Sequence, residues 1–216
     1  MSSSSRSTTS ASLRNPGAVL LLSCYELGRQ PLSLASPLAL LVESGFFPAA
    51  IDLAVERLDP DAVATARFIA IAVPMHTALR LGVKAAARIR SLNPSCHLCF
   101  YGLYATLNAG TLLAGGADSI IGGEYEEPLL RLVERLERDT PAGTVAERKA
   151  PRIVPGVRTR QHPEEPWLKR IRFAVPRRGT LPPLERYARL EHAGASRLAG
   201  QVEASRGCLH HCRHCP

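Results

Sequence analysis

The sequence has few of the features that mark membrane, fibrous or disulfide-rich proteins. Its apolar runs, such as residues 18–22 and 68–73, are far shorter than the roughly 18 residues that a transmembrane helix needs. Six cysteines in 216 residues are too few for a disulfide scaffold, and glycine and proline lack the period of a collagen-like chain. These absences predict a globular, cytoplasmic protein that makes no membrane contact.

The N-terminal residues also lack an apolar core, which disfavours a secretory signal. The first 12 residues are rich in serine and threonine and contain no acidic side chain. We therefore expect a disordered tail over residues 1–15, with a transit peptide bearing Arg6 and Arg14 as the alternative.

Positive charge is concentrated in one segment. Of the net charge of +8, residues 148–190 contribute most, with twelve basic against three acidic side chains. The same segment is rich in proline, which disfavours long helices and predicts an extended linker with one short strand over residues 170–175. The charge serves either solubility or a contact with RNA, for which the segment offers few aromatic stacking partners.

Residues 16–138 alternate between strand and helix patterns. Continuous apolar runs predict buried strands over residues 18–23, 49–54, 68–73, 97–101 and 118–121. Helical patterns lie over residues 34–44, 77–92 and 107–114, in a short helix after Asp59, and in a last helix from Pro128 that follows Glu126 and Glu127. The alternation predicts an α/β domain with a doubly wound, five-stranded parallel sheet of the Rossmann type.

Ligands of such sheets bind at the carboxyl ends of the strands, so the loops there hold the candidate site residues. None of these loops has the G-x-G-x-x-G or Walker A pattern, so neither a nicotinamide site nor nucleotide hydrolysis is supported. His76 and Glu124 each have a structural alternative, at the start of a helix. The candidates are Tyr25, Gly28, His76, Gly102, Gly122, Gly123 and Glu124.

Two groups of cysteines have spacings that metals use. Cys96 and Cys99 fall at or in the fourth strand, where a spacing of three puts side chains on opposite faces, so we interpret them as ordinary strand cysteines. Cys208, Cys212 and Cys215 form C-x-x-x-C-x-x-C. Three such thiolates bind three irons of a cubane cluster and leave the fourth iron open. The alternative is zinc, with a fourth ligand from His210, His211 or His214.

The context of this triplet resembles the opening of radical S-adenosylmethionine (SAM) enzymes. There, the first barrel strand leads into a cluster loop, as the strand expected over residues 201–205 leads through Arg206 and Gly207 into the cysteines. The resemblance implies a 4Fe–4S cluster on Cys208, Cys212 and Cys215. It also implies that the open iron chelates S-adenosylmethionine, which one electron cleaves to a deoxyadenosyl radical.

The preceding domain is similar to the cobalamin-binding domain of one branch of that superfamily. The similarity lies in the loop strings at residues 74–77, 100–105 and 122–126 and in the segment 181–187. It implies cobalamin at the carboxyl edge of the sheet. Some cobalamin proteins have D-x-H-x-x-G after the first strand, but here only Gly28 remains and Tyr25 stands in place of the histidine, so we expect no cobalt ligand from that loop.

These inferences divide the chain into a tail (1–15), a cobalamin-binding-like Rossmann domain (16–138), a basic proline-rich linker (139–195) and the start of a radical SAM domain (196–216). Because a complete barrel needs about 200 further residues, we expect the N-terminal part of an enzyme for methyl transfer or rearrangement, unable to turn over S-adenosylmethionine by itself. The alternatives are a non-catalytic corrinoid or small-molecule module and a zinc-stabilised interaction protein.

Overall fold

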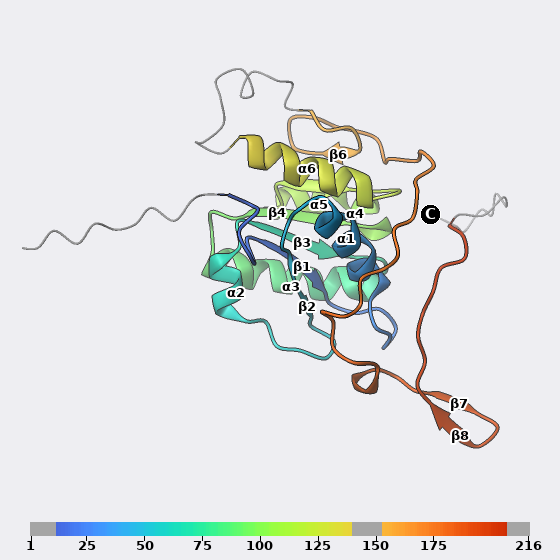
Figure 1. Ribbon diagram of the computed structural model, residues 1–216. Helices are drawn as coiled ribbons and strands as arrows, with labels where there is room; N and C mark the ends of the chain where they lie inside the picture. The colour runs from blue at the N-terminus through green and yellow to red at the C-terminus, as the bar shows by residue number, and fades with distance from the viewer. Residues whose placement is uncertain (1–11, 140–152, 207–216) are drawn as a thin grey trace, which may run out of the picture.

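A six-stranded sheet forms the centre of the computed structural model, which describes residues 12–139 and 153–206 (Figure 1). The strand order is β2-β1-β3-β4-β5-β6, and the first five strands are parallel. Only β6 runs antiparallel, against β5. The strands are β1 (Val19–Ser23), β2 (Ala49–Asp52), β3 (Phe68–Ala72), β4 (His97–Tyr101), β5 (Ser119–Ile121) and β6 (Val157–Arg158).

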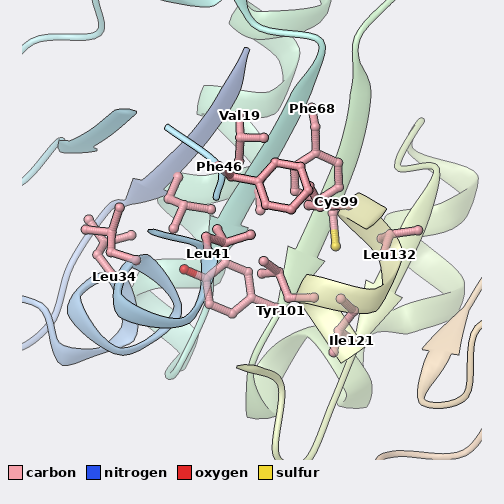
Figure 2. Close-up of a cluster of buried hydrophobic side chains, with 14 of the residues drawn as sticks. Val19, Leu34, Leu41, Phe46, Phe68, Cys99, Tyr101, Ile121 and Leu132 are labelled. Atoms are coloured by element: carbon pink, nitrogen blue, oxygen red, sulfur yellow. The ribbon is translucent and has the colours of Figure 1, made fainter. Parts of the chain in front are cut away.

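Helices cover both faces of this sheet, as the alternating pattern predicts. On one face lie α1 (Leu32–Glu43) and α6 (Glu126–Arg138); on the other lie α2 (Pro60–Thr65), α3 (His76–Leu92), α4 (Leu103–Leu107) and α5 (Ala109–Ala114). Side chains of each strand alternate between the two cores. Figure 2 shows the core under α1 and α6, where Val19, Phe68, Cys99 and Tyr101 of the strands meet Leu34 and Leu132 of the helices.

Cys99 in β4 and Cys96, one residue before that strand, confirm this alternation. Cys99 lies in the core under α1 and α6, and Cys96 lies in the core on the other face. Burial raises the pKa of both thiols, that of Cys99 to about 12. The two thiols therefore do not form a metal pair.

Several predicted elements differ from the structure. The helix expected over residues 107–114 is α5, which begins two residues later, and the preceding loop forms an additional short helix, α4. The two helices meet at Asn108, whose side-chain amide donates to the carbonyl of Tyr104 (2.9 Å). The strands expected over residues 170–175 and 201–205 are absent, because neither segment pairs with another strand. The structure instead adds β6 and a hairpin of β7 (Leu190–His192) and β8 (Ala195–Arg197), short polar strands without an apolar run.

The proline-rich segment is extended, as predicted, but it packs along the domain. The backbone N–H of Arg177 donates to the Ala35 carbonyl in α1 (2.8 Å), and that of Ala188 donates to the Gly28 carbonyl (2.7 Å). Leu181 is buried in the core under α1. Several arginines of the proline-rich segment donate to backbone carbonyl oxygens of the chain, namely Arg158, Arg160, Arg178 and Arg186. The RNA contact and the domain boundaries stay predictions.

Asp52, at the carboxyl end of β2, is completely buried. Its Oδ1 accepts from the N–H of Ala54 (3.1 Å), whereas its Oδ2 has no donor among the described residues. The Tyr187 hydroxyl faces the carboxylate without the geometry of a hydrogen bond. Burial raises the pKa of Asp52 above its ordinary value, so the buried negative charge destabilises the fold at neutral pH.

We expect Asp52→Asn to increase the free energy of unfolding at pH 7 by about 1 kcal/mol. A carboxyl whose pKa is raised by folding loses stabilising effect as pH increases from its unfolded to its folded pKa. The gain should therefore be present at pH 7 and disappear only as pH falls below the unfolded pKa of Asp52, where its carboxyl is protonated in both the folded and the unfolded state. Urea unfolding across this range measures it, with the exposed Glu165→Gln as control. A variant less stable than the parent protein at pH 7 would contradict the argument.

Candidate functional site

A cavity of about 200 Å³ lies at the carboxyl ends of the parallel strands. From β1 the chain continues to β2, toward one edge of the sheet, whereas from β3 it continues to β4, toward the other edge. The direction of the strand order therefore reverses between β1 and β3. Doubly wound sheets bind their ligands in the crevice at this point. The cavity is lined from both sides of it, by Glu26 after β1, Val73 and Pro74 after β3, Tyr101 and Gly102 at the end of β4, and Gly123 and Tyr125 after β5.

A larger cavity, of about 420 Å³, lies at the opposite edge of the sheet. It is lined by residues that precede the strands, among them Arg67 before β3 and His97 at the start of β4. This edge lacks the loops that bind ligands in doubly wound sheets. We therefore take the smaller cavity at the carboxyl edge as the candidate site.

Of the residues proposed from the sequence, Gly102 and Gly123 line this cavity. Gly102 has φ +103°, and a Cβ atom there would lie 3.2 Å from the carbonyl oxygen of Val73. Gly123 has φ +67°, and a Cβ atom there would overlap the carbonyl oxygen of Trp167. Both positions therefore need glycine to keep two loops close together.

The other proposed residues lie in the surrounding loops. Tyr25 is partly buried after β1, and Gly28, with φ +71°, receives the Ala188 N–H at its carbonyl. His76 is exposed at the start of α3, makes no capping hydrogen bond, and has its ring centroid 6.3 Å from that of Tyr104. A Cβ atom at Gly122 would overlap the Thr106 hydroxyl. Tyr25, Gly28, His76 and Gly122 do not line the cavity, and their roles stay predictions.

Glu124 takes part in an ion-pair network that the sequence did not reveal. Arg206 donates to Glu124 Oε2 (2.8 Å), to both oxygens of Glu126 (2.5 and 2.9 Å) and to Glu203 Oε2 (2.6 Å). Glu126 Oε1 also accepts from the Ser36 hydroxyl in α1 (2.7 Å). Glu203 and Arg206 line the cavity. The network therefore joins the loop between β5 and α6 to the C-terminal segment.

Two aromatic rings enclose the Arg206 guanidinium. Its carbon lies 5.3 Å from the ring centroid of Tyr125 and 4.8 Å from that of Phe173. Burial by itself would lower the pKa of Arg206, but the hydrogen bonds to Glu126 and Glu203 outweigh this effect and raise the pKa. The side chain is thus permanently charged and mostly buried, with 16% of its surface exposed. Such a cation is expensive to leave unpaired.

Glu26 adds a further carboxylate to the cavity wall. It accepts from the N–H of Leu32 (2.9 Å), and from the N–H (3.3 Å) and hydroxyl (2.6 Å) of Ser33. It therefore caps α1, whose first residue is preceded by proline without a capping side chain. Burial raises the pKa of Glu26 despite these hydrogen bonds. Acidic groups outnumber the one guanidinium around the cavity.

Cys208, Cys212 and Cys215 lie outside the described residues, which end at Arg206. Within residues 12–139 and 153–206, no group of three or more His, Cys, Asp or Glu side chains is arranged to hold a metal ion. In the same part of the chain, no helix is long and apolar enough to cross a membrane. The iron site predicted on the triplet stays a prediction, and its donors are three thiols without an acidic neighbour within the loop.

The rim of the cavity partly fits a corrinoid. Leu103 after β4 lines the cavity, and Leu27 after β1 follows the lining residue Glu26 in the chain. They are exposed by 47% and 60%, so they offer an apolar surface to a flat macrocycle. The cavity itself is much smaller than such a ring system. The only imidazole that follows β1 or β3 directly in the described chain is that of His76. A corrinoid would therefore rest on the rim rather than fill the cavity.

The fold resembles that of some solved structures. No family model and no curated protein sequence matches this chain. Two structures of the radical S-adenosylmethionine methyltransferase TsrM from Kitasatospora setae do. One has the tryptophan substrate and a SAM analogue bound and gives a TM-score of 0.49, and the other has cobalamin and a [4Fe-4S] cluster bound and gives 0.50.

In both structures the sequence identity is 16%, and the match covers 65% of this chain and 28% of TsrM. The matched part is thus little more than a quarter of that protein. At this identity the likeness concerns the fold alone. It agrees with the α/β architecture and the mostly parallel sheet described above.

Proposed function

We propose that this chain carries the corrinoid-binding domain and the cluster loop of a cobalamin-type radical S-adenosylmethionine enzyme. Cys208, Cys212 and Cys215 would hold a 4Fe–4S cluster with one iron open to S-adenosylmethionine. The loops at the carboxyl edge of the sheet would hold cobalamin. The reaction class would be methyl transfer or rearrangement, on a substrate that the sequence does not identify.

The observation that carries this proposal is the composition of the cavity wall. The cavity lies at the point where a doubly wound sheet binds its ligand, and Glu203 and Arg206 close it from the C-terminal segment. Only Gly207 lies between Arg206 and Cys208, so their Cα atoms are at most about 7 Å apart. A ligand at the carboxyl edge would therefore be close to the start of the cysteine motif, as two cooperating cofactors require.

The residues of this chain would supply binding and orientation. Three thiolates would bind the cluster, and the apolar rim and Gly102 would allow a macrocycle to approach the backbone. When bound, the cluster supplies the electron that cleaves S-adenosylmethionine, and the corrinoid supplies a group carrier for methyl transfer. One of the TsrM structures has cobalamin and a [4Fe-4S] cluster bound together, and these two cofactors are the pair that the proposal requires.

Titration with hydroxocobalamin tests the corrinoid half of the proposal. We expect a saturable change in the cobalt absorption spectrum. Because Tyr25 occupies the position of the absent histidine, Tyr25→His should change the spectrum of the bound corrinoid more than Tyr25→Phe does. His76→Ala measures whether the exposed imidazole contributes. The absence of any saturable change would contradict corrinoid binding.

Metal analysis distinguishes the remaining functions. About four irons and four sulfides per chain after anaerobic reconstitution would support the proposal. Corrinoid binding without iron would indicate a binding module that does not catalyse. One tightly bound zinc, with no uptake of iron, would indicate a zinc-stabilised interaction protein.

A further inference from the structure

The part of the molecule that connects the two proposed cofactor sites is the Arg206 network. Arg206 is the last described residue before the cysteine motif, and its side chain points back into the domain rather than toward solvent. It contacts carboxylates from two separate parts of the chain, Glu124 and Glu126 near α6 and Glu203 on its own segment. These contacts tie the segment directly to the sheet domain.

The geometry of these contacts is well suited to fixing a loop. Arg206 binds Glu126 through two nitrogen atoms, one to each oxygen, which defines the orientation of the guanidinium plane. Glu126 is itself held, because its side chain is buried and accepts from Ser36 of α1. The partners of Arg206 are thus held by α1 and α6, whereas residues 201–206 have no secondary structure of their own.

The same side chain is part of the cavity wall. Arg206 and Glu203 line the cavity together with Tyr125, over whose ring the guanidinium lies. A ligand that enters the cavity must contact or displace this group. Because only Gly207 separates Arg206 from Cys208, a displacement of Arg206 also moves the start of the cysteine motif.

We infer that Arg206 is a positioning residue that couples the cavity at the carboxyl edge to the cysteine loop. It fixes the start of the loop against Glu124 and Glu126, and occupancy of the cavity changes the environment of the loop through it. The coupling to a cluster rests on the function proposed above. The anchoring of residues 203–206 does not, and it is measurable in the metal-free chain.

Hydrogen exchange in the metal-free, full-length chain tests the anchor. We expect Arg206→Gln to increase the exchange rate of backbone amides in peptides covering residues 201–206 about two- to threefold, a modest effect because these amides donate no backbone hydrogen bond within the described residues and only the anchored position of the segment slows their exchange. Glu126→Gln should do the same from the other side of the contact. Arg172→Gln is the matched control, because Arg172 is an exposed arginine of the proline-rich segment. Equal exchange in the Arg206 and Arg172 variants would overturn the inference.

Electron paramagnetic resonance of the reconstituted, reduced chain tests the coupling. We expect Arg206→Gln to keep the iron content of the parent protein, since the three cysteines are intact. Addition of hydroxocobalamin should change the cluster signal of the parent protein and of Arg172→Gln, and this response should be lost in Arg206→Gln. Arg206→Lys, which keeps the charge without the two-point contact, should recover only part of it.

The outcomes separate the two proposals. If the parent protein binds no iron, the proposed function fails while the exchange experiment still decides the anchor. If the cluster forms and the signal of Arg206→Gln responds to hydroxocobalamin as the parent protein does, the coupling fails and the proposed function stands. A loss of folding in Arg206→Gln would be visible as a lowered Tm, in which case Glu124→Gln, which removes one contact of the same network, replaces it.

Discussion

Replacing Cys212 with alanine should remove the iron–sulfur cluster from the reconstituted chain. A cubane cluster held by three thiolates loses a third of its protein ligands with one substitution, and two cysteines do not retain it under anaerobic gel filtration. We expect iron content to fall from about four per chain to a background level, together with the broad absorption of the cluster. Cys208→Ala and Cys215→Ala should give the same result.

The chain contains its own control for this experiment. Cys96 is a free, buried thiol outside the triplet, and burial raises its pKa, so it is a poor metal ligand. Cys96→Ala should therefore keep the iron content of the parent protein. Retention of iron in Cys212→Ala, or its loss in Cys96→Ala, would show that the triplet is not the cluster site.

The second large effect is expected at Gly123, where a methyl group has no room. Gly123 forms a parallel bridge with Trp167, and the next residue, Glu124, donates its N–H to the Trp167 carbonyl (2.6 Å). In Gly123→Ala the new Cβ atom would overlap that carbonyl, and φ of +67° would strain the alanine backbone. We expect a loss of about 3 kcal/mol in the free energy of unfolding, measured with urea.

The fluorescence of Trp167 also shows whether Gly123→Ala disturbs this contact locally. It is the only tryptophan of the chain and is 9% exposed, so its fluorescence reads the contact directly. Gly123→Ala should shift its emission to longer wavelength before global unfolding. Gly110→Ala is the control, because Gly110 lies in α5 with no atom within 4 Å of the added methyl group, and it should be neutral or slightly stabilising. Equal stability of the two variants would show that the bridge does not hold the segment.

The sequence was sufficient to predict the parts of the fold that depend on local pattern. Apolar runs identified the five parallel strands, and Asp59 was identifiable as a cap, whose side chain accepts from the N–H of Asp61 (3.0 Å). The strand β6 has two residues and exists only because Ile120 and Ile121 offer an unpaired edge. No pattern within two residues predicts such a partner.

Some residues of the candidate site could likewise be predicted from the sequence, and others could not. Gly102 and Gly123 were identifiable because a glycine after a buried strand signals a close approach of backbones. Arg206, Glu203 and Glu26 were missed, because their partners lie up to 82 residues away or in an unrecognised capping contact. Ion pairs at that separation leave no periodic signal. The one available clue was the three acidic residues Glu124, Glu126 and Glu127 in one short stretch after the last predicted strand.

The burial of Leu181 in the core under α1 affects the order in which the protein folds during synthesis. The face of α1 that contacts the sheet is made within the first 43 residues, but the side chain that completes its core follows far later in the chain. Contacts of such sequence separation form slowly. The ribosome must release the chain beyond Leu181 before that core closes, and until then the apolar face of α1 is exposed to chaperones and to other nascent chains.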